Sequence, residues 1–186
     1  MKVIWTILIF IIVVIVAFFI FIYTGQYDVA ATKPHTKITE FILDIATEKS
    51  IRSHAAGIAV PSLDDKSMVK TGFNHYDEMC VGCHGAPGIK PSDIGKGLYP
   101  EPPELPDEID EFSSEELYWI TKNGIKMTGM PAFGSTHSEE ELWSIVAFLK
   151  QLPDLTPEEY KAMVGSEETQ NHEHDHGADD EHHHEH

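Results

Sequence analysis

Basic residues are scarce in this chain: 13 Lys and Arg stand against 31 Asp and Glu, and the formal net charge is −18. Nucleic-acid binding needs a basic surface that neutralises phosphates, so the composition argues against that class of function. The shortage is greatest at the C-terminus, where the last 21 residues include eight acids and no Lys or Arg. The acidity either keeps the protein soluble or steers it toward a basic surface on a protein partner.

Cysteine is almost absent, and the two that occur, Cys80 and Cys83, precede His84 in the run Cys-Val-Gly-Cys-His. A structural zinc site needs about four ligands, and a second cysteine pair is missing. A thioredoxin-type redox pair follows a strand, but no strand-like alternation of apolar and polar residues precedes these cysteines. A plain disulfide would leave His84 unexplained. The spacing is instead typical of covalent attachment of haem c, in which two thiols one helical turn apart bind the porphyrin edge and the next histidine binds the iron.

The iron needs a second axial ligand from elsewhere in the chain. A methionine thioether opposite a histidine fills both axial positions, which gives an electron carrier rather than a site that activates oxygen. Met130 lies in the glycine-bracketed loop 129–134 between two predicted helices, and such a loop can bring a side chain over a flat ring. We therefore predict Met130 as the ligand. The alternatives are Met127 and then His75 and His137, whereas Met163 is expected in the core or on the surface.

An uncharged run extends from Val3 to Tyr23. As a helix it would rise about 31 Å, which matches the hydrocarbon core of a bilayer. We expect residues 1–23 to be a single anchor in the cytoplasmic membrane, with Lys2 on the cytoplasmic side and the rest of the chain periplasmic. Cleavage as a signal peptide is the alternative, because residues 29–31 (Val-Ala-Ala) could be a cleavage site. The run is longer than the core of about 7–15 residues that signal peptides have.

Residues 24–66 are expected to form a linker that contains one amphipathic helix, at residues 37–54. Its apolar residues recur at helical spacing and make one stripe: Ile38, Phe41, Ile42 and Ile45. This stripe could pack on the haem domain, lie on the membrane surface or dock a partner subunit.

Residues 67–165 are predicted to be an all-α haem domain. Its helices are expected near residues 67–79, 113–123, 138–152 and 158–164, with a long loop at 85–112. Ser113 with Glu116, and Ser138 with Glu141, have the spacing of capping boxes that begin a helix. The last 21 residues, 166–186, contain no apolar groups able to form a core and are expected to be disordered.

Two motifs resemble the class I monohaem cytochromes c: Cys80-Val-Gly-Cys83-His84 and Gly129-Met130-Pro131-Ala132-Phe133. The second is similar to the distal-ligand loop of algal photosynthetic cytochromes and of cytochrome c subunits of haem-copper oxidases. The resemblance spans about residues 67–153 and implies three to four helices around one covalent haem.

The resemblance also implies roles for single residues. Gly72 and Tyr76 of the first helix would cross the last helix at Ile145 and Phe148. The carbonyl of Pro103 would accept a hydrogen bond from His84 Nδ1 and so fix the imidazole. Further groups are expected to line the ring: Tyr99, Leu105, Trp119, Ile125 and Phe133.

The C-terminal tail contains seven histidines among acids: His172, His174, His176, His182, His183, His184 and His186. Imidazoles at this density can bind Cu²⁺, Zn²⁺ or Ni²⁺ without a fold. Protonation below about pH 6.5 should abolish such binding. The alternatives are a solvated end or part of an expression tag.

The sequence therefore predicts a membrane-anchored electron carrier, not an enzyme, that exchanges single electrons with extracytoplasmic redox partners. It could act as a subunit of a respiratory complex. The stretch 101–116, with eight carboxylates and no base, would face a basic partner surface or solvent. Two other classes remain open: a haem peroxidase or catalytic redox subunit with an open sixth position, and a metal-handling protein.

Overall fold

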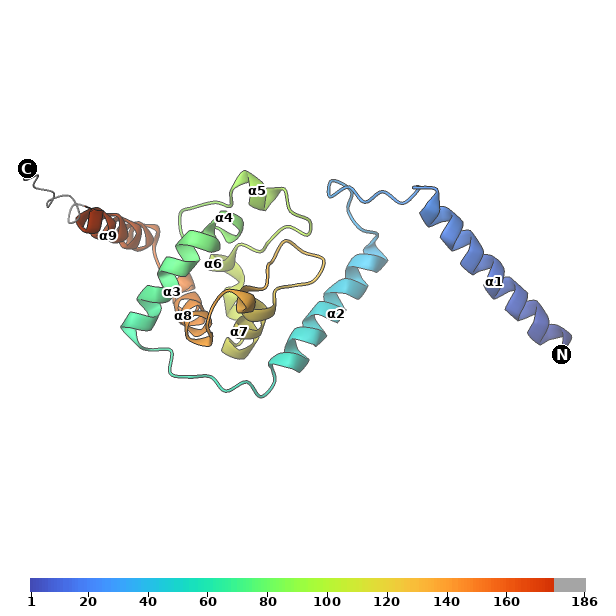
Figure 1. Cartoon of the computed structure of the whole chain (residues 1–186), viewed down its shortest axis with the longest axis horizontal. Helices are drawn as coiled ribbons and strands as arrows, with labels where there is room; N and C mark the ends of the chain where they lie inside the picture. Colours follow the sequence, from blue (N-terminus) through green and yellow to red (C-terminus); the bar gives the residue numbers. More distant parts are fainter. Residues whose placement is uncertain (176–186) are drawn as a thin grey trace, which may run out of the picture. The chain divides into compact units, whose positions relative to one another are not determined.

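The computed structural model describes residues 1–175, with side chains to residue 166, and all of its elements in this range are helices (Figure 1). Only an isolated bridge between Ala86 and Ile89 has β character there. The all-α prediction is confirmed. The chain divides into two compact units, one of residues 1–36 and one that begins at Lys37.

The first unit contains helix α1 (Lys2–Tyr23), which is apolar on every side. Its mean hydropathy over an 18-residue window is 3.4, and none of its residues is buried. By length and composition α1 could cross a membrane, and it lies where a signal sequence would also lie. It is the one helix of this kind within residues 1–175.

The second unit is built around helices α3 (Lys66–Met79) and α8 (Glu139–Leu149), which cross closely. A Cβ atom on Gly72 would clash with the backbone of Ser144 and lie 2.9 Å from Phe148 Cβ, so only glycine permits this approach. Tyr76 and Phe148 are fully buried at the crossing. The crossing implied by the resemblance is therefore present.

Helix α7 (Ser114–Asn123) packs on α8, and both helices begin as the sequence predicts. Ser113 and Ser138 are the N-caps, and each forms a complete capping box, with Glu116 and Glu141 respectively. These boxes satisfy backbone N–H groups that a helix start would otherwise leave unpaired.

The predicted loop 85–112 contains more structure than expected. It includes α5 (Asp93–Lys96), α6 (Leu105–Glu108) and the 3₁₀ turn η1 (Ile109–Glu111). Ser92 caps α5 through a bond to Gly95 N, and Pro106 sits in the first turn of α6, where its missing N–H costs nothing. Single turns such as these carry too little periodicity to be predicted.

The C-terminal helix α9 (Pro157–Asp175) is longer than predicted, because its backbone is helical beyond residue 164. The sequence predicts disorder from residue 166, whereas the backbone of residues 166–175 is helical in the structure. Tyr160 of α9 is fully buried and donates a hydrogen bond to Asp77 Oδ1 at 2.8 Å. Residues 176–186, with His176, His182, His183, His184 and His186, lie outside the described residues.

Helix α2 (Lys37–Ala55) belongs to the second unit and packs on α7. Of the three placements left open for its apolar stripe, packing on the haem domain does not occur in the structure. Ile38, Phe41, Ile42 and Ile45 are all exposed, whereas Ile51 and Ala55 are buried. The helix thus turns a different face to the domain.

Candidate haem site

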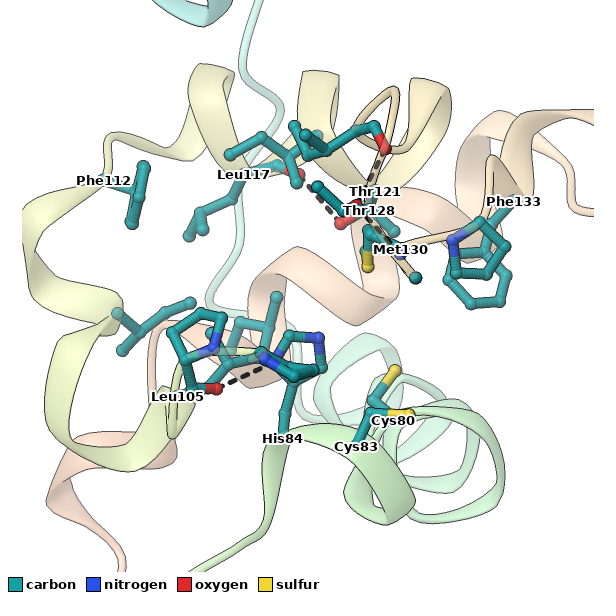
Figure 2. A pocket seen from close by; sticks show the side chains of 18 of the residues that line it. Cys80, Cys83, His84, Leu105, Phe112, Leu117, Thr121, Thr128, Met130 and Phe133 are labelled. Atoms are coloured by element: carbon teal, nitrogen blue, oxygen red, sulfur yellow. Dashed lines mark hydrogen bonds between the residues drawn. The ribbon is translucent and has the colours of Figure 1, made fainter. Parts of the chain in front are cut away.

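The Cys-Val-Gly-Cys-His motif forms one tight helical turn at the end of α3. Cys80 ends α3, and Val81–His84 form the short helix α4. Hydrogen bonds from Cys83 N and His84 N to Cys80 O, at 3.0 and 2.9 Å, hold the turn. Both sulfurs consequently lie beside His84 on one side of the turn (Figure 2).

Gly85 allows the chain to turn away immediately after His84. Its φ of +70° is a conformation that other residues rarely adopt, and a Cβ there would lie 2.8 Å from Ile89 O. Gly95 meets the motif from the other side, where a Cβ would lie 2.9 Å from Cys83 Cα. Packing on both sides therefore fixes where the turn presents its side chains.

The imidazole of His84 is held by a hydrogen bond. Its Nδ1 lies 2.9 Å from the carbonyl oxygen of Pro103, and because that oxygen can only accept, Nδ1–H donates. This is the bond implied by the resemblance, and it leaves Nε2 as the unprotonated nitrogen. Burial lowers the pKa of His84 below 6.5, against a smaller opposite effect of the Pro103 bond. The neutral ring is the form that binds a metal.

A cavity of about 290 Å³ opens over His84. That volume is close to the lower end of the range of about 300–1,000 Å³ typical of ligand pockets. Its lining comes from α2, α3, α4, α7, α8 and the loops around Pro103 and Met130. Most of these side chains are apolar, so the cavity suits a large apolar ring.

Met130 lies across this cavity from His84, with its sulfur pointing into the space (Figure 2). The loop that carries it is closed by a bond from Met130 N to Thr128 Oγ1 at 3.1 Å and one from Ile125 N to Met130 O at 3.3 Å. Gly124, which ends α7 with φ +64°, lets the loop approach, since a Cβ there would lie 2.7 Å from Met130 O. Local hydrogen bonds and a glycine thus position the methionine.

The other candidate ligands lie elsewhere. Met127 is 71% exposed and Met163 packs against the hydrophobic core. His75 and His137 pack against each other, with ring centroids 5.2 Å apart, and neither lines the cavity. Within the described residues, Met130 is the candidate that reaches the cavity beside His84.

Most of the residues expected near the ring line the cavity: Cys80, Cys83, His84, Pro103, Leu105, Ile125, Met130 and Phe133. Tyr99 and Trp119 do not. Leu98 and Pro100, on either side of Tyr99, line it instead, and Trp119 packs on His54 at 5.5 Å between ring centroids. Sequence reasoning missed Thr47 and Ile51 of α2, which also line the cavity. The more apolar residues of α2 lie on another face of the helix, so periodicity does not indicate these two.

These residues fit a covalent haem. A porphyrin needs an apolar slot, two sulfurs at its edge, and axial ligands on opposite faces. Burial and the neighbouring Cys83 raise the pKa of the Cys80 thiol to about 12, so the site favours an uncharged sulfur there. A thioether bond would make that sulfur permanently neutral. No cluster of three or more metal-binding side chains occurs among the residues that the structure describes.

Comparison with known proteins finds a family model that matches the same segment. Residues 67–149 match the family model described as cytochrome c oxidase, cbb3-type, subunit III. Among solved structures, the chain is similar to the c-type cytochrome XoxG from Methylobacterium extorquens AM1, with 26% identity and a TM-score of 0.35. The match covers 46% of this chain and 50% of XoxG, so the chain spans about half the length of that relative. No curated protein matches the chain.

Proposed function

We propose that this chain, whose residues 67–149 form a class I monohaem cytochrome c domain, carries single electrons between protein partners outside the cytoplasmic membrane. The observation that supports this most is the arrangement of one cavity. His84 and Met130 face it from opposite sides, and Cys80 and Cys83 lie at its edge.

Haem c, which the family implies, supplies an iron that accepts and releases one electron. Cys80 and Cys83 would hold its edge covalently. His84 Nε2 and the Met130 sulfur would occupy both axial positions, and the Pro103 carbonyl would keep the imidazole oriented. With both axial positions occupied in this way, no position at the iron would remain for a substrate. The proposal is therefore an electron carrier rather than an enzyme.

The alternative of a peroxidase or catalytic redox subunit requires an open or weakly held sixth position. The hydrogen bonds that close the loop around Met130 favour the carrier.

A cytochrome c domain implies redox partners. For the partner we infer a basic docking surface, because the stretch 101–116 has eight carboxylates and no base and would attract one at long range. Raising the ionic strength should then slow electron transfer to the physiological partner. The name of the matching family supports a place within a respiratory oxidase complex. Co-purification of an oxidase with the membrane-extracted protein would test it.

We propose that α1 anchors the domain to the cytoplasmic membrane, with its N-terminus inside. The absence of charge from Val3 to Tyr23 supports a span, and Lys2 supports the orientation. N-terminal sequencing of the membrane-extracted protein tests it: an intact Met1 or Lys2 agrees with an anchor, and a start near Thr32 means a cleaved signal peptide. Protease treatment of right-side-out vesicles should then remove the haem domain.

The histidine-rich tail supports a second, separate capability: binding of Cu²⁺, Zn²⁺ or Ni²⁺. Seven imidazoles lie within residues 172–186, from His172 to His186. Titrating the full chain with Zn²⁺ at pH 7.5 and at pH 5.5 should give binding only at the higher pH. A chain lacking residues 171–186 is the control and should bind at neither pH.

The direct test of the proposed function is covalent haem. The purified full chain should keep its haem through denaturation and reduction, and it should take up one electron per molecule in a redox titration. Replacing both Cys80 and Cys83 with alanine should abolish the retained haem. A wild-type protein that releases its porphyrin on denaturation would contradict the proposal.

A further inference from the structure

Helix α2 lies outside the segment that matches the cytochrome family, residues 67–149, yet it contributes to the haem cavity. Ile51 is 6% exposed and lines the cavity, and Thr47, one turn earlier, also lines it and is half-buried. Ala55, one turn later, is buried. These three residues form one row along the helix at a spacing of four.

The C-terminal half of α2 is attached to α7 by specific contacts. Arg52 Nε lies 3.8 Å from a carboxylate oxygen of Glu116, in the first turn of α7. The ring of His54 packs on Trp119 with centroids 5.5 Å apart, and His54 Nδ1 lies 2.8 Å from Ser50 O. Leu117 and Ile120 of α7 line the cavity beside Ile51. The contacts therefore hold α2 where the cavity needs a wall.

Another face of the same helix gives an internal comparison. Ile45 is 41% exposed and lies six residues before Ile51. At this spacing the two side chains point about 120° apart around the helix axis. Ile38, Phe41 and Ile42 are exposed with it. Two isoleucines on one helix thus differ in burial and in whether they line the cavity.

Residues that line a haem cavity influence the reduction potential of the iron by controlling how much water reaches the porphyrin. The oxidised haem carries one more positive charge than the reduced haem, and an environment without water disfavours the charged state. An apolar wall therefore raises the reduction potential, and a polar group or water at the same place lowers it.

We propose that α2 is a wall of the haem pocket that excludes water from the porphyrin and so sets part of its reduction potential, with Ile51 and Thr47 as the positioning residues. This inference rests on the proposed function, since it concerns the same haem. It assigns a role to residues 47–55, a segment that the family model does not include.

The test uses conservative variants of the full chain in detergent, each measured by equilibrium redox titration. Ile51→Thr adds a hydroxyl to the wall and should lower the midpoint potential. At a fixed ambient potential the ratio of reduced to oxidised protein should fall about two- to fivefold, where tenfold corresponds to 59 mV for one electron. Thr47→Val removes a hydroxyl at nearly constant shape and should shift the ratio the other way. General loosening of the helix would not shift the midpoint potential in opposite directions in the two variants.

Ile45→Thr is the matched control and should leave the midpoint where it is in the wild type. A second readout is amide hydrogen exchange over residues 47–55, which should be faster in Ile51→Thr than in Ile45→Thr. The inference is overturned if Ile51→Thr and Ile45→Thr shift the potential equally, or if neither Ile51→Thr nor Thr47→Val shifts it.

A failure of the proposed role of α2 can be told apart from a failure of the proposed electron carrier. If the wall variants change nothing while Met130→Ala lowers the potential, the proposed carrier stands and the role of α2 is wrong. If wild-type protein contains no covalent haem, the proposed function itself fails.

Discussion

The hydroxyl of Tyr76 donates a hydrogen bond of 2.6 Å to the carbonyl oxygen of Gly85, nine residues further along the chain. Tyr76 is fully buried on α3, and Gly85 follows His84 directly. Burial, and to a lesser degree Cys80, raises the pKa of this phenol far above its usual value, so it remains protonated and able to donate. The bond joins the core helix to the end of the haem motif.

Replacing Tyr76 with phenylalanine should destabilise the domain by about 1–3 kcal/mol, because the buried carbonyl of Gly85 loses its donor. Urea unfolding followed by circular dichroism measures the change. The packing of the ring against Phe148, with centroids 5.3 Å apart, is kept in this variant. An unfolding midpoint equal to that of the wild type would mean that the hydrogen bond contributes nothing to stability.

The crossing of α3 and α8 should not tolerate a side chain at position 72. In Gly72→Ala the new Cβ meets the Ser144 backbone, which cannot move as a flexible side chain could. We expect the melting temperature to fall by well over 10 °C, or the domain not to fold; about 1 kcal/mol corresponds to roughly 4–8 °C in a domain of this size.

Gly165→Ala is the control for this change, since a Cβ at Gly165 meets no described atom within 4 Å. That variant should be neutral or slightly stabilised, because alanine favours helix over glycine. An equal fall in melting temperature in both variants would show that the helix crossing is not the cause of the destabilisation.

The capping box of α8 should make stability depend on pH in the acid range. Hydrogen bonds from the backbone and then the side chain of Ser138 lower the pKa of Glu141 below 4.5. A carboxyl whose pKa is lower in the folded than in the unfolded state stabilises the folded state. This contribution is complete above the pKa of the unfolded state and is lost as the pH falls through the pKa of the folded state. The melting temperature should therefore fall below about pH 4.5.

Glu141→Gln keeps hydrogen-bonding capacity at this position but removes the titrating group. Its melting temperature should fall less steeply than that of the wild type between pH 4.5 and pH 3. Glu140, which has no comparable bond to Ser138, supplies the control variant Glu140→Gln. If the melting temperatures of the wild type and Glu141→Gln fell equally with pH, the Glu141 carboxylate would not be the source of the pH dependence.

Much of the fold could be predicted because its signals are local. A serine followed three residues later by glutamate marks a helix start wherever it occurs, so α7 and α8 were found at Ser113 and Ser138. The haem motif is equally local, since one turn of helix determines where Cys80, Cys83 and His84 lie. The position of Met130 at the cavity could be predicted because its loop lies between two recognisable helices.

The role of α2 could not be predicted, because its face toward the domain is less apolar than the face away from it. Periodicity identifies the face with more hydrophobic residues, here Ile38, Phe41, Ile42 and Ile45, and these are exposed. Thr47 and Ile51 acquire their position from contacts with α7, which lies more than 60 residues later in the chain. The sequence of one segment does not indicate which distant segment it will contact.

The measurement that tests the central claim most directly is the redox titration of Met130→Ala beside Met127→Ala, each in the full chain. Met130→Ala should keep covalent haem, lose the absorption band that a methionine sulfur gives the oxidised haem, and have a lower midpoint potential. Met127→Ala should match the wild type in both respects, since Met127 lies outside the cavity lining. If Met130→Ala keeps the wild-type spectrum and midpoint, His84 and Met130 do not together hold the iron.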